Sequence, residues 1–291
     1  MNNAREALYW SAAESGSKAV RCGLCPHRCN IKDGDAGICA MRENRGGALI
    51  ATGYAQVSSV ALDPIEKKPL YMFHPGKHIL SIGGFGCNLR CPFCQNYEIS
   101  SEYRSIRRNA KSLAPEDVAA LAVQTARDGN IGAAYTYNEP LIGYEFLYDC
   151  AILVREAGLY NVIVTNGYIN REPLEALLPV IDAMNIDLKS FTDSFYRKVG
   201  GDLETVKETI VCSSERCHVE VTTLIIPGEN EGDIEELAKW LSSVDPEIPL
   251  HLTRFFPRYH YSDRAPTPRE TVYKLCETAR RYLKHVFAGN T

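Results

Sequence analysis

The sequence has no long apolar run. No stretch of the 291 residues approaches the ~20 consecutive apolar residues of a membrane-spanning helix, and residues 1–6 lack the apolar region of a signal peptide. Positive charge is not in excess either, because the formal net charge of −4 disfavours a protein whose main role is to coat nucleic acid. We therefore expect a cytoplasmic globular protein without membrane or nucleic-acid partners.

Three of the 11 cysteines lack a fourth cysteine nearby. Cys87, Cys91 and Cys94 follow an apolar run, residues 79–82, that is typical of a strand. The next cysteine along the chain is Cys150. Closed zinc sites and closed iron–sulfur clusters use four protein ligands. Three thiolates would therefore leave one iron of a four-iron, four-sulfur cluster open to a small molecule, unless the three are ordinary thiols or zinc ligands that share this spacing by chance.

The Cys-x3-Cys-x2-Cys loop, with the aromatic Phe93 before its last cysteine, resembles the signature of radical S-adenosylmethionine (SAM) enzymes. The resemblance implies that the three cysteines ligate a 4Fe-4S cluster whose open iron binds the amino and carboxylate groups of SAM. It further implies that one electron from the reduced cluster cleaves SAM to a 5′-deoxyadenosyl radical, which removes a hydrogen atom from a substrate. An electron donor such as flavodoxin or ferredoxin is then expected, and Phe93 is expected beside the cofactor.

The segments after residue 78 alternate between strand-like and helix-like patterns. Six strand–helix units predict an α/β protein with a parallel sheet, and because a closed barrel needs eight units, they predict a partial (β/α)6 TIM-like barrel. Residues 1–75 differ in character and are predicted to form a small Cys-rich N-terminal module before a barrel domain of residues 76–291. The predicted strands are 79–84, 131–137, 161–167, 183–189, 218–226 and 250–256, and the predicted helices are 115–128, 141–157, 172–180, 203–213, 233–244 and 269–287.

Polar residues follow several of these strands, where the chemistry of a parallel barrel gathers. Glu139 stands where the family's glycine-glycine-glutamate element binds the amino group of SAM, which is the role that the resemblance implies for it. Tyr137 and Asn138 stand where that element most often has two glycines, so the backbone is expected to be less free to approach the ligand. The alternative role for Glu139 is a carboxylate favoured by the dipole at a helix N-terminus.

Two further strand ends carry the motifs Thr165-Asn166-Gly and Asp187-Leu-Lys189. Both resemble the activating enzymes of glycyl radical proteins, and the resemblance implies that these residues contact the ribose and the carboxylate of SAM. An Asp187–Lys189 ion pair inside the barrel is the alternative. His251 and Arg254, near the sixth strand, are candidates for a role facing the substrate or for a structural role.

The N-terminal segment has four cysteines with x2, x3 and x9 spacings, Cys22, Cys25, Cys29 and Cys39. Four soft ligands so close together suit structural zinc or an auxiliary iron–sulfur cluster, with His27 as a substitute ligand. Unligated thiols or a redox disulfide are the alternatives. The remaining cysteines, Cys150, Cys212, Cys217 and Cys276, lack ligand spacing and are expected to be simple thiols.

Several runs resemble the radical enzyme of the three-component AmmeMemoRadiSam system, a family related to pyruvate formate-lyase activating enzymes. They are Glu6-Ala-Leu-Tyr-Trp10, the Cys22–Cys29 run, Asp63-Pro-Ile-Glu-Lys-Lys-Pro69 and Cys94-Gln-Asn. The resemblance implies the other two proteins of that system as partners and leaves the substrate open. Two other functions remain as alternatives: activation of a glycyl radical enzyme, and a non-catalytic iron–sulfur carrier.

Overall fold

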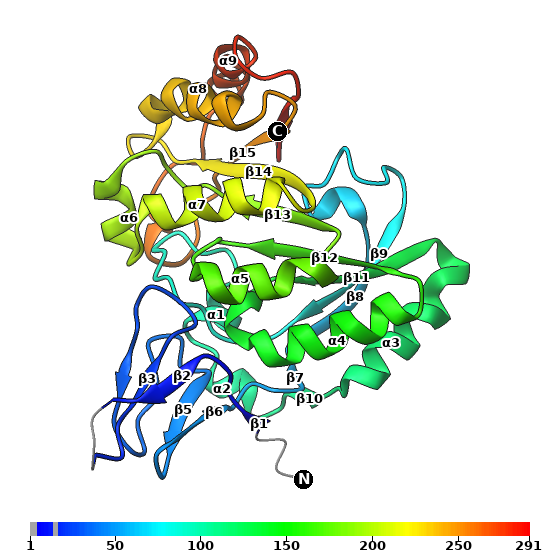
Figure 1. Cartoon of the computed structure of the whole chain (residues 1–291). Helices are drawn as coiled ribbons and strands as arrows, with labels where there is room; N and C mark the ends of the chain where they lie inside the picture. Colours follow the sequence, from blue (N-terminus) through cyan, green and yellow to red (C-terminus); the bar gives the residue numbers. More distant parts are fainter. Residues whose placement is uncertain (1–4, 14–16) are drawn as a thin grey trace.

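The computed structural model describes residues 5–13 and 17–291 (Figure 1). Residues 1–4, on which part of the signal-peptide expectation rests, lie outside the described residues. Within the described ranges, no helix is both long and apolar enough to cross a membrane.

An eight-stranded sheet forms the centre of the fold. Its spatial order is β16-β15-β14-β13-β12-β11-β9-β8, so β16 and β8 are its two edges and the barrel is open. Neighbouring strands are parallel from β9 to β16, whereas β8 runs antiparallel to β9. The strands are β8 (Ser59–Pro64), β9 (His78–Gly83), β11 (Asn130–Thr136), β12 (Tyr160–Thr165), β13 (Ala183–Asp187), β14 (His218–Ile225), β15 (Leu250–Arg254) and β16 (Val286–Gly289).

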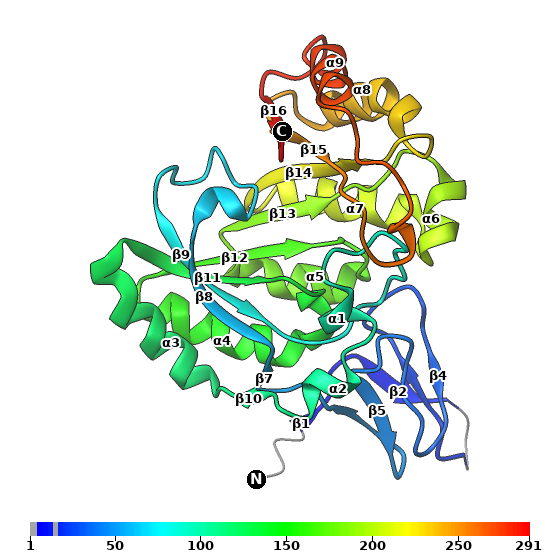
Figure 2. The same ribbon diagram turned by 180° about the vertical axis from the view of Figure 1, so that it is seen from behind.

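Helices cover one face of this sheet, as the two opposite views show for α3, α4, α5 and α7 (Figures 1 and 2). The strands from β9 to β15 are buried along most of their length, as expected for parallel strands under a helical layer. The α/β fold with a parallel sheet was predicted and is confirmed. The helices are α1 (Tyr97–Ser100), α2 (Arg104–Arg107), α3 (Pro115–Gln124), α4 (Tyr144–Glu156), α5 (Arg171–Leu177), α6 (Asp193–Val199), α7 (Leu203–Ser214), α8 (Ile234–Val244) and α9 (Arg269–Ala279).

Local sequence explains several helix ends. Pro115 occupies the first turn of α3, where a missing N–H costs little, and the Asp117 carboxylate accepts a hydrogen bond from the Ala114 backbone N–H at 3.1 Å. Asp202 caps α7 by accepting from the Thr205 backbone N–H at 2.8 Å. Gly158, just after α4, has φ +75°, a conformation that glycine adopts without strain.

The structure corrects the sequence prediction at both edges of the sheet. The last helix was predicted to extend to residue 287, but α9 ends at Ala279 and residues Val286–Gly289 form β16 instead. Leu250 N–H donates to the His285 carbonyl at 2.9 Å, which brings this segment beside β15. At the opposite edge, β8 belongs to the segment predicted as the N-terminal module, so residues before 76 also build the barrel sheet.

Three small antiparallel sheets precede or flank the barrel. In both views the N-terminal strands lie near the end of the large sheet at which the arrows of β12 and β13 finish (Figures 1 and 2). The division into two domains at residue 75 stays a prediction. The small sheets comprise β1 (Arg5–Glu6), β6 (Ala48–Ala51) and β5 (Arg42–Arg45); β2 (Trp10–Ala12), β3 (Val20–Cys22) and β4 (Asn30–Ile31); and β10 (Lys111–Ser112) with β7 (Gln56–Val57).

Candidate active site

One cavity of about 380 Å³ lies where the parallel strands end, a volume in the usual range of small-molecule sites. Every residue that the sequence predicted for the cluster and for SAM lines it. Residues from different strands, far apart in the chain, are therefore brought to one place. They are Cys87, Cys91, Phe93, Cys94, Glu139, Thr165, Asn166, Asp187 and Lys189.

The cysteine loop follows β9 directly, and two of its sulfur atoms have polar neighbours. Cys87 Sγ accepts hydrogen bonds from the Leu89 backbone N–H at 3.4 Å and from Asn166 Nδ2 at 3.6 Å. Cys94 Sγ lies 3.3 Å from Ser100 Oγ. Donors aimed at sulfur stabilise the negative charge of a thiolate or of a cluster that it ligates. Asn166, at the end of β12, thus supports the cysteine loop that follows β9.

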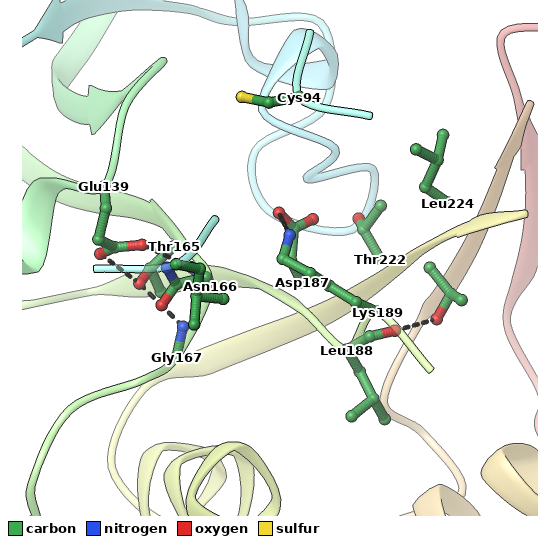
Figure 3. A network of polar contacts seen from close by, with 12 residues as sticks. Cys94, Glu139, Thr165, Asn166, Gly167, Asp187, Leu188, Lys189, Thr222 and Leu224 are labelled. Carbon is green, nitrogen blue, oxygen red and sulfur yellow. Dashed lines mark hydrogen bonds and ion pairs between the residues drawn. The ribbon is translucent and has the colours of Figure 1, made fainter. Parts of the chain in front are cut away.

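Glu139 is buried, with 3% of its surface exposed. Its Oε1 accepts a hydrogen bond from the Leu141 backbone N–H at 3.0 Å. Oε1 also accepts one from Thr165 Oγ1 at 2.7 Å, and Oε2 accepts one from the Asn166 backbone N–H at 2.8 Å (Figure 3). Burial raises the pKa of Glu139 to about 7, although these hydrogen bonds act to lower it. A carboxylate offers about four acceptor sites, so Oε2 retains one for a further donor.

Asp187 and Lys189 form an ion pair across one face of the strand end, with Lys189 Nζ 2.9 Å from Asp187 Oδ2. Figure 3 shows both in the same part of the site as Thr222 and Leu224. Burial acts to lower the pKa of Lys189, but the charge and hydrogen bond of Asp187 and the negative charge of a Cys91 thiolate together outweigh burial, so the pKa is raised above its ordinary value. The Lys189 side chain is therefore an ammonium group that keeps donors for a second acceptor.

The Tyr137 backbone has φ +72°, a left-handed conformation that is uncommon outside glycine. The Tyr137 hydroxyl donates to Asp63 Oδ2 at 2.5 Å, and Lys68 Nζ donates to the same oxygen at 2.8 Å. Lys68 Nζ also lies 4.5 Å from the centre of the Tyr137 ring. Asn138 joins this turn to the cysteine loop by accepting from the Gly84 backbone N–H at 2.8 Å. A tyrosine and an asparagine, held by side-chain contacts, thus form the turn in which the family's element most often has two glycines.

Neither His251 nor Arg254 lines the cavity. His251 is 2% exposed, and its Nε2 lies 2.6 Å from Glu220 Oε2 inside the sheet. Arg254 Nε donates to the Thr267 carbonyl at 2.6 Å. Of the two alternatives that the sequence left open for these residues, the structural role is the one that their contacts support.

Several cavity residues were not predicted. Thr222 and Leu224 lie two and four residues after the buried Glu220, on the same face of β14. This spacing could have predicted them as residues that face inward. Lys67 and Lys68 belong to the segment predicted as the N-terminal module, and nothing in the local pattern places a lysine beside a cavity. The remaining unpredicted residues include Thr253 and Asn290, near the far edge of the sheet.

The comparisons with known proteins agree with this geometry. Residues 81–241, more than half of the chain, match the radical SAM superfamily. The chain therefore belongs to the radical SAM superfamily and is a radical SAM enzyme by family. That membership implies an iron–sulfur cluster and SAM as cofactors, and the sulfur and polar groups gathered in one cavity fit both.

Individual relatives refine the picture. An uncharacterized protein of Methanocaldococcus jannaschii is 42% identical over 293 residues, which cover 98% of this chain and 85% of that protein. Pyruvate formate-lyase 1-activating enzyme of Escherichia coli (strain K12) is 24% identical over 152 residues, covering 51% of this chain and 61% of that protein. The crystal structure of Streptococcus suis SuiB bound to its precursor peptide SuiA has the same fold, with a TM-score of 0.55 at 15% identity over 71% of this chain and 47% of that one.

Proposed function

We propose that this protein holds a 4Fe-4S cluster at Cys87, Cys91 and Cys94 and uses it to cleave SAM reductively, so that a hydrogen atom is abstracted from a substrate. The observation that carries the proposal is the shared cavity, which joins the three cysteines to Glu139 and Lys189. A metal centre with three protein ligands keeps one position for a small molecule, as catalytic sites do. The chemistry that the cluster and SAM would supply together is one-electron cleavage of a carbon–sulfur bond.

Glu139 is proposed to bind the amino group of SAM. Its Oε2 has an acceptor site left over after the hydrogen bond from Asn166, and a buried carboxylate binds an ammonium group more strongly than an exposed one. Thr165 and Asn166 hold the carboxylate in place by donating to both of its oxygens. The residue therefore has a fixed orientation before any ligand arrives, which lowers the cost of binding.

Lys189 and Asp187 are proposed to contact the carboxylate and the ribose of SAM. The Lys189 ammonium can donate to an anion while it stays paired with Asp187, because it has three donors. Leu224 lines the same cavity and is proposed to supply apolar surface for the adenine. Phe93, 5% exposed and packed near Phe195 and Tyr261, closes the wall beside the cysteines.

The proposal is tested anaerobically. The protein is reconstituted with iron and sulfide, reduced in the presence of SAM, and assayed for 5′-deoxyadenosine. The wild type should form the product and Cys91→Ala should not, while Cys212→Ala, at a partly buried thiol outside the cavity, should behave like the wild type. Product formation by Cys91→Ala would refute the proposal, and a full cluster with intact SAM would favour the iron–sulfur carrier instead.

Activation of a glycyl radical enzyme is the second candidate function, because a pyruvate formate-lyase activating enzyme is among the relatives. This function has the same cofactor chemistry and differs only in its substrate, a glycine residue of a partner protein. Incubation of the reduced enzyme and SAM with a candidate partner would then give a glycyl radical signal in electron paramagnetic resonance. Consumption of SAM by the enzyme in the presence of the partner, without that signal, would argue for another substrate.

We also propose the AmmeMemoRadiSam system as the context of this enzyme, with the other two proteins of that system as partners and a flavodoxin or ferredoxin as electron donor. Support comes from the matching sequence runs, among them Asp63-Pro-Ile-Glu-Lys-Lys-Pro69, whose Asp63 and Lys68 hold Tyr137 beside the cavity. A cytoplasmic location suits this role because a reducing compartment keeps thiols available for iron. Co-purification of the three proteins tests the partnership. At about micromolar affinity, the complex that survives a salt wash should exceed that of a scrambled control by more than tenfold. A tenfold or smaller excess would count against the partnership.

A further inference from the structure

The four N-terminal cysteines line one small pocket. Cys22, at the end of β3, is joined to Cys29 by a hydrogen bond from its backbone N–H to the Cys29 carbonyl at 3.0 Å. A turn over Cys25, closed by the Arg28 backbone N–H at 3.1 Å, lies between them. The chain returns to the pocket at Cys39, from a different loop. The free space inside is about 10 Å³, which is room for about one water molecule or one ion.

A buried arginine completes this pocket. Arg42 lines it, is 1% exposed, and pairs through one terminal nitrogen with Glu145 Oε1 at 3.0 Å. Another terminal nitrogen donates to the Leu8 carbonyl. Its Nε–H is buried and has no hydrogen-bond partner in the described ranges, although almost all buried donors in proteins are satisfied. A thiolate sulfur in the pocket would accept that hydrogen bond.

The pocket is linked to the candidate active site through Asn88, the residue after the first cluster cysteine. His27 Nε2 donates to the Asn88 carbonyl at 2.8 Å, and the Asn88 side chain is within hydrogen-bonding range of the Cys25 thiol. On its other side, Asn166 Nδ2 donates to Asn88 Oδ1 at 2.9 Å and also reaches Cys87 Sγ at 3.6 Å. Asn88 and Asn166 together therefore connect the two sets of cysteines.

We propose that Cys22, Cys25, Cys29 and Cys39 bind a metal through four thiolates, and that this closed centre positions Asn88 and the loop that carries Cys87. Four protein ligands leave no open position, so the centre is structural and not a second site for SAM. The small space favours a single ion such as zinc, and a four-iron cluster of the same ligand chemistry would need the walls to move apart. His27 Nε2 is engaged by the Asn88 carbonyl, so only its Nδ1 could replace one of the four thiolates.

Metal binding requires small movements of the thiols. In the described parts of the chain, no group of three or more Cys, His, Asp or Glu side chains is arranged to hold an ion as it stands, and this includes Cys87, Cys91 and Cys94. Rotation about one side-chain bond moves a cysteine sulfur between three staggered positions without moving the backbone. The loop geometry around the pocket can therefore stay as it is while the sulfur atoms turn inward.

The amount of metal bound per chain is measured in full-length protein that lacks the three cysteines of the candidate active site. A radical-null variant, Cys87→Ala with Cys91→Ala and Cys94→Ala, is loaded separately with zinc or with iron and sulfide and then desalted. About one zinc or about four irons per chain would support the site and identify its metal. Adding Cys22→Ala and Cys25→Ala should abolish binding, whereas adding Cys212→Ala and Cys217→Ala, the same number of lost thiols outside the pocket, should not.

Absence of both metals from the radical-null variant would overturn the proposal, and so would metal retained after Cys22 and Cys25 are replaced. Because the latter variant can fail to fold, cobalt substitution of the radical-null variant gives an independent measurement. Four thiolates around cobalt produce strong sulfur-to-metal charge-transfer absorption, and its absence would also overturn the proposal. The radical-null protein cannot form 5′-deoxyadenosine by the proposed route, so the result does not depend on the proposed function.

The link to the candidate active site has its own readout. Hydrogen exchange of residues 86–90 is compared in the radical-null variant with and without the N-terminal metal. Removal of the metal should speed exchange at the Gly86 and Arg90 amides, which donate to the Ile99 and Val199 carbonyls, about tenfold or more, because the loop between them loses the contact at Asn88. Exchange in α8, on a distant part of the barrel, is the internal reference. Equal exchange at residues 86–90 in the two states would refute the positioning role while leaving the metal site intact.

Discussion

The Tyr137 hydroxyl donates a 2.5 Å hydrogen bond to Asp63, a residue 74 positions earlier in the chain. Asp63 belongs to β8, the antiparallel edge strand, and Tyr137 follows β11 and lines the cavity. The bond matters because Tyr137 has a left-handed backbone that costs free energy in a non-glycine residue. The Asp63-Pro-Ile-Glu-Lys-Lys-Pro69 run thus supports the turn that leads to Glu139.

Replacement of Lys68 should therefore be costly. Lys68 is 2% exposed and pairs with Asp63 at 2.8 Å, so Lys68→Met leaves a buried carboxylate without its main partner. Breaking a buried pair from one side costs about 3–5 kcal/mol of unfolding free energy. The neighbouring Lys67 reaches the same carboxylate at 3.5 Å but is largely exposed, so Lys67→Met should cost about 1 kcal/mol or less. Urea unfolding of the two variants makes the comparison, and equal losses would contradict the assigned role of Lys68.

Glu139→Gln should weaken SAM binding without removing the cluster. The change keeps the shape of the side chain and removes the charge proposed to bind the amino group. Charge-assisted hydrogen bonds contribute about 1.5–3 kcal/mol, which corresponds to an affinity about 10–100-fold lower. Equilibrium binding of SAM to reconstituted protein measures the change in affinity, and iron content shows whether the cluster is still present. Glu116→Gln, at an exposed position on α3, is the matched control and should leave the affinity unchanged.

The two proposed roles of the Asp187–Lys189 pair can be separated by a double-mutant cycle. If Lys189 contacts the ligand and Asp187 only supports it, Lys189→Met should lower SAM affinity about tenfold or more, and Asp187→Asn should add little in the Lys189→Met background. If Asp187 binds the ribose independently, the two losses should add. The same affinity measurement distinguishes these outcomes. No loss in either single variant would leave only the ion-pair alternative.

The part of the site that the sequence predicted followed from the order of the strands along the chain and from the alternation of side chains between the two faces of a strand. Asp187 and Lys189 point to one face because residues two apart do so in a strand, and the ends of parallel strands meet at one edge. Thr222 and Leu224 could have been found in the same way. Their polar and apolar character is ordinary for a buried strand, so nothing local marked them as cavity residues.

Other features depended on contacts between distant residues. The left-handed backbone of Tyr137 is stabilised by Asp63 and Lys68, and no short-range pattern connects these positions. The edge strand β16 is four residues long and follows a helix, so its apolar residues continued the helical pattern until pairing with β15 decided their structure. Short apolar runs are ambiguous between helix and strand for this reason.

Acid should destabilise the protein in part through Glu220. Burial acts to raise the pKa of this residue, but hydrogen bonds from two histidines and two backbone N–H groups lower it to about 2. The donors are His218, His251, Met72 and Tyr71. Because the pKa in the folded state lies below the ordinary value of 4.5, the carboxylate stabilises the protein above pH 4.5, and this contribution is lost as the pH falls through about 2.

Glu220→Gln removes that contribution. The difference in unfolding free energy between wild type and variant should be about 3 kcal/mol near neutral pH and should shrink as the pH falls below the ordinary pKa. Urea unfolding at several pH values and fixed metal content measures the difference, and the other carboxylates cancel because both proteins contain them. A difference that stays constant with pH would mean that the carboxylate charge is not what stabilises the wild type.

Gly86, the residue before Cys87, packs closely against the loop that carries Cys39. It has φ +79°, and a Cβ atom there would lie 2.6 Å from the Cys39 carbonyl oxygen and 2.8 Å from Met41 Cγ. The first contact is with backbone, which cannot move aside without shifting the loop that carries Cys39. Gly86→Ala should therefore lower the unfolding free energy by at least about 2 kcal/mol through backbone strain and overlap together.

Gly84→Ala is the matched control for this prediction. Its backbone is not left-handed, and an added Cβ would meet its nearest atom, Asn138 Oδ1, at 3.5 Å, an ordinary contact distance. Metal content of the two variants is measured alongside unfolding. Gly86→Ala should reduce metal at both cysteine sets, because its side chain pushes apart the loops of Cys39 and Cys87, whereas Gly84→Ala should retain both. Loss of iron at Cys87, Cys91 and Cys94 alone would mean that the two loops can move independently.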